Sequence, residues 1–307
     1  MNFKTYFRLL FPIVVVFGLI AFALYQYMLN ISKPFPDHAK ADMPEMQAPK
    51  DTIKVGVISR FPSNILYQGY QPLMDYLSAN TDYYFELKIS RDYLNAVNLL
   101  TERTVDMAFL GSYIYTVARN TYDIKPILKP LNENREPFFK SSLIVREDSG
   151  IYSIADLKGK RLALPSEQSY SGNWLLGYGL QEYNLTSEEI SEIAFFDHHH
   201  YVVYEVMRKN FDAGSVKDRV ALEFRQRGLR IVAESVPVPG SPLVVSANAN
   251  PHIVDLVRSV LVQIDPEKPE YQEIMKNWDR EFMFGFTLAQ ASDYDVLEQL
   301  IQGYRDL

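Results

Sequence analysis

The sequence contains no cysteine, and this absence removes several kinds of chemistry at once. A chain without cysteine forms no disulfide, no thiolate metal site and no cysteine nucleophile. It also has no cysteine that could carry the lipid of an exported lipoprotein. Any attachment of this chain to a membrane must therefore be made by the polypeptide itself.

The sequence also lacks an excess of positive charge, because 31 Lys and Arg residues are outnumbered by 38 Asp and Glu residues. Proteins that bind nucleic acid neutralise its phosphates with a basic face, so we expect no nucleic-acid partner. Three common enzyme motifs are missing as well: the GxSxG elbow, the GxxxxGK[ST] phosphate loop and the GxGxxG fingerprint. We therefore expect a binding protein that is not an enzyme and needs no cofactor.

A long apolar run is present near the N-terminus. It covers residues 9–29 and follows two positive charges, Lys4 and Arg8. About 20 residues at ~1.5 Å each match a hydrocarbon core of ~30 Å. Positive charges before such a span predict that the N-terminus stays inside and the rest of the chain outside. Residues 1–29 are thus predicted to form a transmembrane anchor.

The alternative for this segment is a cleaved signal peptide, with the small residues of 21–23 (AFA) as the cleavage site. Residues 30–50 are rich in Pro, Ala and charge and are predicted to be a linker. With either fate of residues 1–29, the folded body lies on the extracytoplasmic face of the membrane, anchored there or released.

From Thr52 onward, short apolar runs alternate with amphipathic, helix-like segments. This alternation predicts βαβ units and a largely parallel sheet, hence an α/β fold. Strands are predicted at residues 53–58, 84–89, 107–110, 124–131, 142–145, 161–164, 193–196, 229–234 and 243–246. Helices are predicted at residues 70–79, 93–102, 113–120, 173–182, 202–209, 253–263, 270–276 and 294–304.

The alternation of strands and helices begins a second time in the middle of the chain, which predicts two lobes. The first lobe is predicted to comprise residues 51–138 and 243–307, and the second residues 139–242. If the chain crosses near 138–145 and returns near 236–243, two strands join the lobes. Such a hinge leaves a cleft between them.

Several short patterns follow one another in a recognisable order. They are 54–57 (KVGV), 91–93 (RDY), 105–115 (VDMAFLGSYIY), 149–151 (SGI), 156–160 (DLKGK), 169–172 (SYSG), His199, 212–214 (DAG), 234–235 (ES) and 239–240 (PG). This series resembles the periplasmic phosphonate-, phosphite- and phosphate-binding proteins of ABC importers, the PhnD-like family. The resemblance implies a type II periplasmic binding protein fold with a two-strand hinge. The chain departs from the family pattern at Tyr170, where Thr is usual, and at Ser112, where Pro is usual.

The SYSG segment lies between a predicted strand and a predicted helix, and this placement favours an anion site. A helix N-terminus presents unpaired N–H groups and a partial positive charge to an anion. Ser171 is expected to cap a helix that begins near residue 173, and Ser169 to add a hydroxyl donor. Gly172 is expected to let a ligand approach the backbone, and Tyr170 either donates its phenol or narrows the cleft. The alternative is an ordinary serine N-cap without a ligand.

Gly111 and Ser112 form a second strand-to-helix junction, which we expect to face the first across the cleft. The resemblance implies that Tyr93 and Tyr115 donate hydroxyls and His199 a ring N–H to the ligand. A packed core position is the alternative for Tyr115, because the chain has 21 tyrosines.

Residues 197–200 (DHHH) raise the question of a metal, but adjacent residues of a strand point to opposite faces. No spaced ligand motif accompanies them, so we expect no metal site. Asp212 and Glu234 are weaker candidates for contact with an amine on the ligand, as the resemblance implies for relatives with amine-bearing ligands.

The predicted function is capture of a small phosphorus oxyanion, with an ABC permease as the partner. Two alternatives remain open at this point. The tethered protein could report its ligand to a membrane sensor, since a tether raises local concentration near a partner. It could also bind an organic or quaternary-amine ligand in a cage of tyrosines.

Overall fold

The computed structural model describes residues 16–20, 22, 24 and 50–305. The chain divides into two units, Met1–Pro49 and Lys50–Leu307. In the first unit the described residues are helical, and the predicted anchor and linker lie largely outside the described residues. Within the ranges described, every helix is too short or too polar to span a bilayer.

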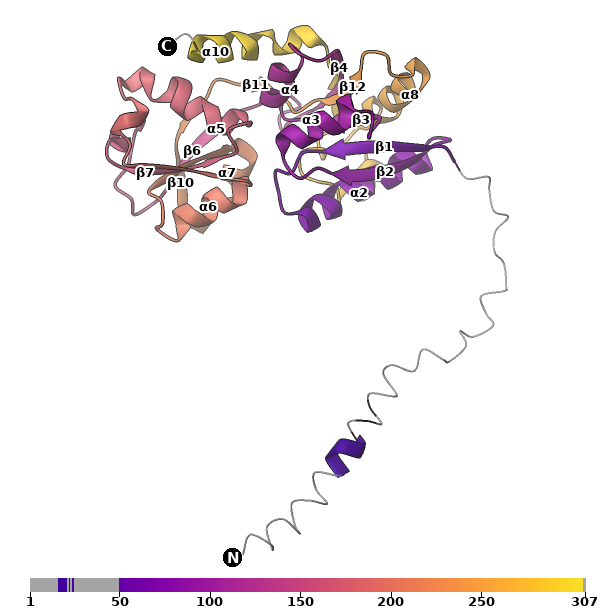
Figure 1. The fold of residues 1–307 in the computed structure, drawn as a ribbon, viewed down its shortest axis with the longest axis horizontal. Helices are drawn as coiled ribbons and strands as arrows, with labels where there is room; N and C mark the ends of the chain where they lie inside the picture. Colours follow the sequence, from indigo (N-terminus) through magenta and orange to yellow (C-terminus); the bar gives the residue numbers. More distant parts are fainter. Residues whose placement is uncertain (1–15, 21, 23, 25–49, 306–307) are drawn as a thin grey trace, which may run out of the picture. The chain divides into compact units, whose positions relative to one another are not determined.

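The second unit contains two main sheets, each with helices packed against it (Figure 1). The first sheet has six strands, in the order β13 (Phe286–Leu288), β4 (Ile124–Pro130), β12 (Leu243–Ser246), β3 (Met107–Phe109), β1 (Thr52–Val57) and β2 (Tyr84–Ile89). Its helical segments are α2 (Ser63–Ala79), α3 (Tyr93–Thr101), α4 (Ser112–Ala118), α8 (Pro251–Val262), α9 (Pro269–Met275) and η7 (Ala291–Tyr294). Helix α10 (Asp295–Arg305) contacts α4, but its buried Leu297 and Ile301 belong to the apolar cluster of the second sheet.

The second sheet is built from the middle of the chain and lies at the left of Figure 1. Its five strands follow the order β10 (Leu229–Glu234), β6 (Ser141–Arg146), β9 (Ala213–Lys217), β7 (Arg161–Pro165) and β8 (Glu192–Phe196). Its helical segments are η2 (Ile154–Leu157), α5 (Tyr170–Trp174), η3 (Leu175–Gly179), η4 (Gln181–Tyr183), η5 (Ser187–Glu189), α6 (His199–Met207), α7 (Asp218–Phe224) and η6 (Arg225–Arg227).

Two short strands lie in the segments that connect the sheets. β5 (Phe138–Phe139) follows β4, β11 (Val238–Pro239) precedes β12, and the two pair in an antiparallel manner. The predicted crossings near 138–145 and 236–243 contain these strands. The chain thus leaves the first sheet through β5 and returns to it through β11.

The prediction of largely parallel sheets is only half right, because both sheets are mixed. β1 pairs in parallel with β2 and β3, and β7 with β8 and β9. β12 and β6, however, run antiparallel to β3 and β9. Each of these two strands enters its sheet directly from the other sheet, and so runs opposite to the strands that belong to βαβ units.

Strand β9 and helix α7 were not predicted. β9 reads AGSVK, and its two apolar residues do not form a recognisable run, although all five of its residues are buried. A central strand with buried polar residues is unusual in a core. The strand that the sequence did not predict is thus one whose buried polar side chains do not serve apolar packing.

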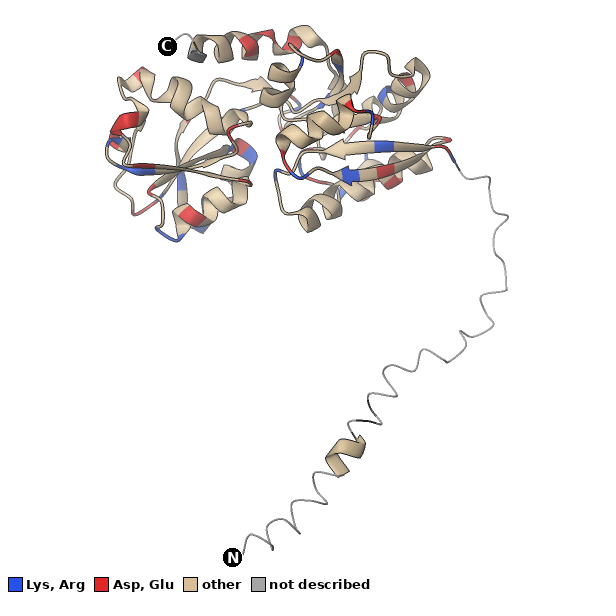
Figure 2. Ribbon diagram, in the orientation of Figure 1, with Lys and Arg blue, Asp and Glu red and all other residues tan. Residues whose placement is uncertain are grey.

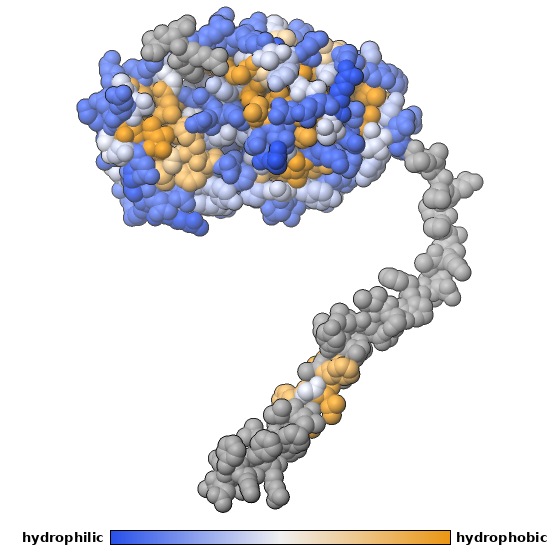
Figure 3. Space-filling view, in the orientation of Figure 1, coloured by the Kyte–Doolittle hydropathy of each residue, from blue (hydrophilic) through white to orange (hydrophobic). Residues whose placement is uncertain are grey.

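The core against the first sheet contains a cluster of packed aromatic rings. Tyr70 of α2 packs edge-on against Phe109 and Phe282, with ring centroids 5.7 and 4.8 Å apart. The two tryptophans are both buried, with Trp174 packed near the second sheet at 2% exposure and Trp278 near the first at 4%. On the face shown in Figure 3, hydrophilic residues surround several separate apolar patches, as is normal for a folded protein.

Helix α10 is held on α4 by ion pairs. Arg119, directly after α4, lies 2.8 Å from a carboxylate oxygen of Asp295 and 2.5 Å from one of Glu298. Figure 2 shows acidic residues along α10. These ion pairs hold the C-terminal helix α10 against α4.

Candidate functional site

A small cavity of about 30 Å³ lies where four helices begin. Helices α3 and α4 follow strands of the first sheet, and α5 and α6 follow strands of the second. A single water needs ~10–15 Å³ on this scale, so the cavity holds only a few heavy atoms. The lining residues are Ile58, Arg60, Tyr93, Gly111, Ser112, Phe139, Ser169, Tyr170, Ser171, His199, Lys217 and Ser241.

Most of the residues predicted to contact a ligand meet at this cavity. They are Tyr93, Gly111, Ser112, Ser169, Tyr170, Ser171 and His199. Tyr115, Gly172, Asp212 and Glu234 do not line it. The structure thus brings together segments from both sheets that lie up to about 100 positions apart in the sequence.

The helix starts leave backbone N–H groups at the cavity. The first N–H groups of any helix have no partner within the helix. Gly111 is the N-cap of α4 and His198 that of α6, and no side chain of residues 50–305 caps either helix. In contrast, the Asp92 carboxylate accepts a hydrogen bond from the Asn95 N–H at the start of α3, at 2.7 Å.

The prediction that Ser171 caps its helix is wrong. Helix α5 begins at Tyr170, and the Ser169 Oγ accepts the capping hydrogen bond from the Gly172 N–H at 3.0 Å. Ser171 therefore lies within the first turn. Its buried hydroxyl has no hydrogen-bond partner among the described residues, which is a costly state for a buried polar group.

The backbone of Ser171 is held in place from behind. Its carbonyl accepts a hydrogen bond from the Ser215 Oγ at 2.7 Å, and Ser215 Oγ lies 2.9 Å from Ser141 Oγ. Ser215 and Ser141 are both fully buried. The polar residues of β9 thus support the segment that presents the free hydroxyl.

Gly172 has a packing role that the sequence analysis did not predict. A Cβ on this residue would lie 2.3 Å from the carbonyl oxygen of Ser166 and 2.7 Å from that of Pro165. Glycine is required because the first turn of α5 packs directly against the backbone that follows β7. The predicted approach of a ligand to this backbone stays a prediction.

Two tyrosines line the cavity as neutral phenols. Burial raises the pKa of Tyr170 to about 12, and burial also raises the pKa of Tyr93. The ring of Tyr170 lies edge-on to Phe139, with centroids 5.9 Å apart. Both side chains are 3% exposed, so they act as walls as well as polar groups.

His199 is a neutral imidazole. Its pKa is well below the ordinary value, because burial and the charges of Lys217 and Arg60 disfavour the imidazolium. Its Nδ1 accepts a hydrogen bond from the Lys217 N–H at 3.3 Å. A neutral ring that accepts at Nδ1 carries its proton on Nε2, so the side chain is a donor there.

The neighbouring histidines form no metal centre. His200 Nε2 lies 3.6 Å from a carboxylate oxygen of Glu223. In the part of the chain that the structure describes, no three His, Asp or Glu side chains gather closely enough to hold an ion.

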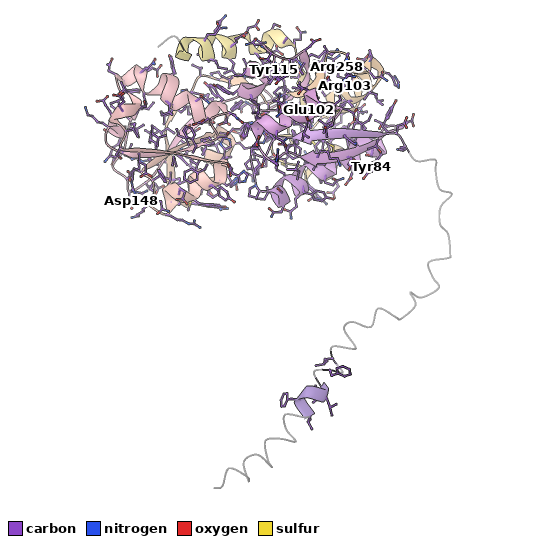
Figure 4. All side chains as sticks on the ribbon, viewed as in Figure 1. Tyr84, Glu102, Arg103, Tyr115, Asp148 and Arg258 are labelled. Carbon is purple, nitrogen blue, oxygen red and sulfur yellow. The ribbon has the colours of Figure 1, made fainter. Side chains whose placement is uncertain are left out.

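Tyr115 is a core residue. It is fully buried, and its ring packs edge-on against Tyr294 with centroids 4.8 Å apart. Figure 4 labels it where α4 lies beneath α10. Tyr115 does not line this cavity, and the implied donation of its hydroxyl to a ligand stays a prediction.

The two weaker candidates have partners elsewhere. Asp212 lies 2.9 Å from the guanidinium of Arg161, and Glu234 lies 3.0 Å from Lys140 Nζ. Arg161 holds the pKa of Asp212 below its ordinary value. Neither carboxylate is directed at the cavity.

Two buried cations of the cavity were missed by the sequence analysis. Arg60 Nη1 donates to Ser241 Oγ at 3.2 Å, and Arg60 also contacts Tyr70 and Glu281. Lys217 Nζ lies 2.8 Å from Glu281 and 4.3 Å from the centroid of the Phe139 ring. Arg60 follows β1 and Lys217 ends β9, and ligands of open α/β sheets bind at such strand ends. For Arg60, which follows the predicted strand at 53–58, that position was an available signal, whereas the strand that ends at Lys217 was not predicted.

The two cations share one carboxylate. Burial alone would raise the pKa of Glu281, but the charges of Arg60 and Lys217 hold it below its ordinary value. Burial lowers the pKa of Lys217, and Glu281 opposes this effect. Each cation thus has its counter-charge at the same carboxylate, Arg60 in direct contact and Lys217 Nζ at 2.8 Å.

Comparison with known proteins supports the fold and the family. The family described as "ABC transporter, phosphonate, periplasmic substrate-binding protein" matches residues 55–294. The phosphate-import protein PhnD of Mycolicibacterium smegmatis is 24% identical over 231 residues, covering 69% of this chain and 72% of that protein.

Two solved structures are similar to the chain with a TM-score of 0.73 each and 19% identity. One is a binding protein component of an ABC phosphonate transporter from Pseudomonas aeruginosa, where the match covers 83% of this chain and 87% of that one. The other is PhnD1 from Prochlorococcus marinus in complex with methylphosphonate, where it covers 85% and 100%. These likenesses show the two-lobed α/β fold of periplasmic binding proteins.

Proposed function

This chain belongs to the family of periplasmic substrate-binding proteins of phosphonate ABC transporters, and we propose that its cavity captures a small phosphorus oxyanion for delivery to an ABC permease. Phosphonate, phosphite and phosphate are the ligands considered. The observation that carries the proposal is the cavity itself. There a buried hydroxyl with no hydrogen-bond partner among the described residues meets two cations and the N-termini of four helices.

The lining matches the needs of a tetrahedral oxyanion. Such a ligand needs several hydrogen-bond donors and compensation of its charge in a site with little water. Ser171 Oγ and His199 Nε2 supply side-chain donors, and the start of α4 supplies backbone N–H groups. Arg60 and Lys217 supply positive charge. The same two cations oppose a quaternary-amine ligand, despite the aromatic walls.

The remaining assignments follow from the family. We propose that residues 51–138 with 243–307, and residues 139–242, are the two lobes of a type II binding protein. We propose that β5 and β11 are its two-strand hinge. The body acts on the extracytoplasmic side of a bacterial inner membrane, where residues 1–29 tether it.

Titration calorimetry of the purified full-length protein with phosphate, phosphite and methylphosphonate tests the proposal. We expect at least one of these anions to bind, and choline not to bind. In Ser171→Ala the ligand loses one hydrogen bond to a charged group, worth ~1.5–3 kcal/mol, so the affinity falls roughly ten- to hundredfold.

Ser259→Ala is the matched control, because Ser259 lies on the exposed face of α8 and its hydroxyl bonds only the Leu256 carbonyl among the described residues. Its affinity should equal that of the wild type. Failure of all three anions to bind, or unchanged binding by Ser171→Ala, would refute the proposed site.

A further inference from the structure

Glu281 lies between the two cations of the cavity without lining the cavity itself. It belongs to the segment between α9 and β13, whereas Arg60 follows β1 and Lys217 ends β9 in the other sheet. Both ion pairs are almost fully buried, with side-chain exposures of 5% and 3% for Arg60 and Glu281 and of 11% for Lys217. The carboxylate is thus a fixed component of the site's charge.

The other titratable groups that line the cavity are uncharged. Tyr93 and Tyr170 are neutral phenols and His199 is a neutral imidazole, for the reasons given above. Two positive charges and one negative charge remain, so the cavity and its direct ion partner have a net charge of +1.

The next surrounding groups do not add positive charge. Arg219 pairs with Asp279 at 3.6 Å, so their charges cancel. The Asp218 carboxylate, next to Lys217, accepts hydrogen bonds from the N–H groups of Lys140 and Arg219, at 2.8 and 2.7 Å. Burial raises the pKa of this group, and any negative charge that it carries adds to the cost of a second charge on the ligand.

Tyr70, which contacts Arg60, is neutral, and the His200–Glu223 pair lies next to His199 in the sequence. The Lys140–Glu234 pair and the exposed Arg280 line a neighbouring pocket together with Lys217 and Glu281, where solvent screens their charges.

We propose that Glu281 makes the site selective for singly charged tetrahedral oxyanions over doubly charged ones. The inference rests on the proposed function and names the charge state of its ligand. A monoanion neutralises the cavity together with its direct ion partner. A dianion leaves one negative charge uncompensated where the effective dielectric constant is low, and that is costly. Without Glu281, the same cavity would match a dianion.

The first test is the pH dependence of the wild-type affinity, measured by calorimetry with phosphite and with methylphosphonate. Each ligand loses its second proton at a different pH, phosphite at the lower one. We expect each affinity to fall about tenfold per pH unit above that ligand's own second ionisation, because only the singly charged fraction binds. An affinity that stays level or rises there, or a decline at the same pH for both ligands, overturns the inference.

The second test is Glu281→Gln, which keeps the shape and removes the charge. We expect the decline with pH to disappear, so that the affinity at alkaline pH exceeds that of the wild type by at least tenfold. Asp279→Asn is the matched control, since it removes a carboxylate from the same segment whose partner is Arg219. It should keep the wild-type decline.

The wild-type measurement decides the inference even if Glu281→Gln does not fold. The two proposals also fail differently. Binding of an oxyanion with the wrong pH dependence overturns the selectivity of Glu281 alone. Absence of binding by every phosphorus oxyanion overturns the proposed function, and the inference with it.

Discussion

The two sides of the cavity hold their polar groups in different ways. On the side of the first sheet, Ser112 Oγ donates to the Pro239 carbonyl at 2.5 Å, and Arg60 is bound by Ser241, Tyr70 and Glu281. On the side of the second sheet, the Ser171 hydroxyl has no partner among residues 50–305.

This difference separates two tasks. The first side contributes the charge of Arg60 and a connection to the hinge segment, and its side chains are already engaged within the protein. Lys217, the other cation, comes from the second side but is bound by Glu281 of the first. The second side contributes hydrogen-bond donors that await a ligand, and these are held by close backbone packing at Gly172 and by buried serines. The predictions below test this division.

The largest effect is expected for Gly172→Ala. Its new methyl group would meet two backbone carbonyls at 2.3 and 2.7 Å, and backbone atoms cannot rotate away. Overpacking typically costs ~1–3 kcal/mol and sometimes more, so we expect a loss of about 3 kcal/mol in the free energy of unfolding. Urea denaturation measures it.

Gly111→Ala is the matched control on the first side. Its Cβ would meet Ile58 at 3.4 Å and Tyr93 at 3.5 Å, which are ordinary contacts. We expect a change in stability of less than ~1 kcal/mol. Equal losses in the two variants would show that the two helix starts are packed alike.

The second prediction concerns the stability of the folded protein at acidic pH. The pKa of His199 lies well below its ordinary value of 6.5 in the folded protein, so below about pH 6.5 the unfolded state binds more protons. Stability therefore falls as the pH decreases, by up to ~1.4 kcal/mol per pH unit. Denaturation at neutral and mildly acidic pH should show this slope, reduced in His199→Gln. Identical slopes in the two proteins would contradict a neutral buried imidazole.

The smallest effect is expected for Ser112→Ala. Its hydroxyl is bonded to the Pro239 carbonyl and is not available to a ligand. Losing this bond should cost ~1 kcal/mol of stability and change oxyanion affinity by less than about threefold. A loss of affinity as large as that of Ser171→Ala would remove the distinction between the two sides.

Much of the fold could be predicted because the strands with apolar runs and the helices that follow them are marked by local patterns. Most of the cavity lining also lies in recognisable patterns, such as SYSG at 169–172 and GSYIY at 111–115. Within these patterns the individual roles were less predictable. Ser169 and Ser171 are both suitable caps, and only the helix start at Tyr170 decides between them.

The site features that the sequence did not predict depend on contacts between distant segments of the chain. Lys217 was missed because β9 lacks an apolar run, and its burial is compensated by Glu281, 64 positions later. Tyr115 lies in a matching motif, but Tyr294 packs against it from near the other end of the chain. Such ion pairs and ring contacts leave no local pattern in the sequence.

The placement of the two tryptophans has a practical consequence. Trp174 ends the helix that contains Ser171, and Trp278 directly precedes Asp279, the residue paired with Arg219. Tryptophan emission depends on the polarity and motion of its surroundings. Since each sheet with its helices contains one buried indole, replacing either with Phe leaves a chain whose tryptophan emission reports on one side alone. Ligand titrations followed in these two variants can assign an optical signal to each side without any attached dye.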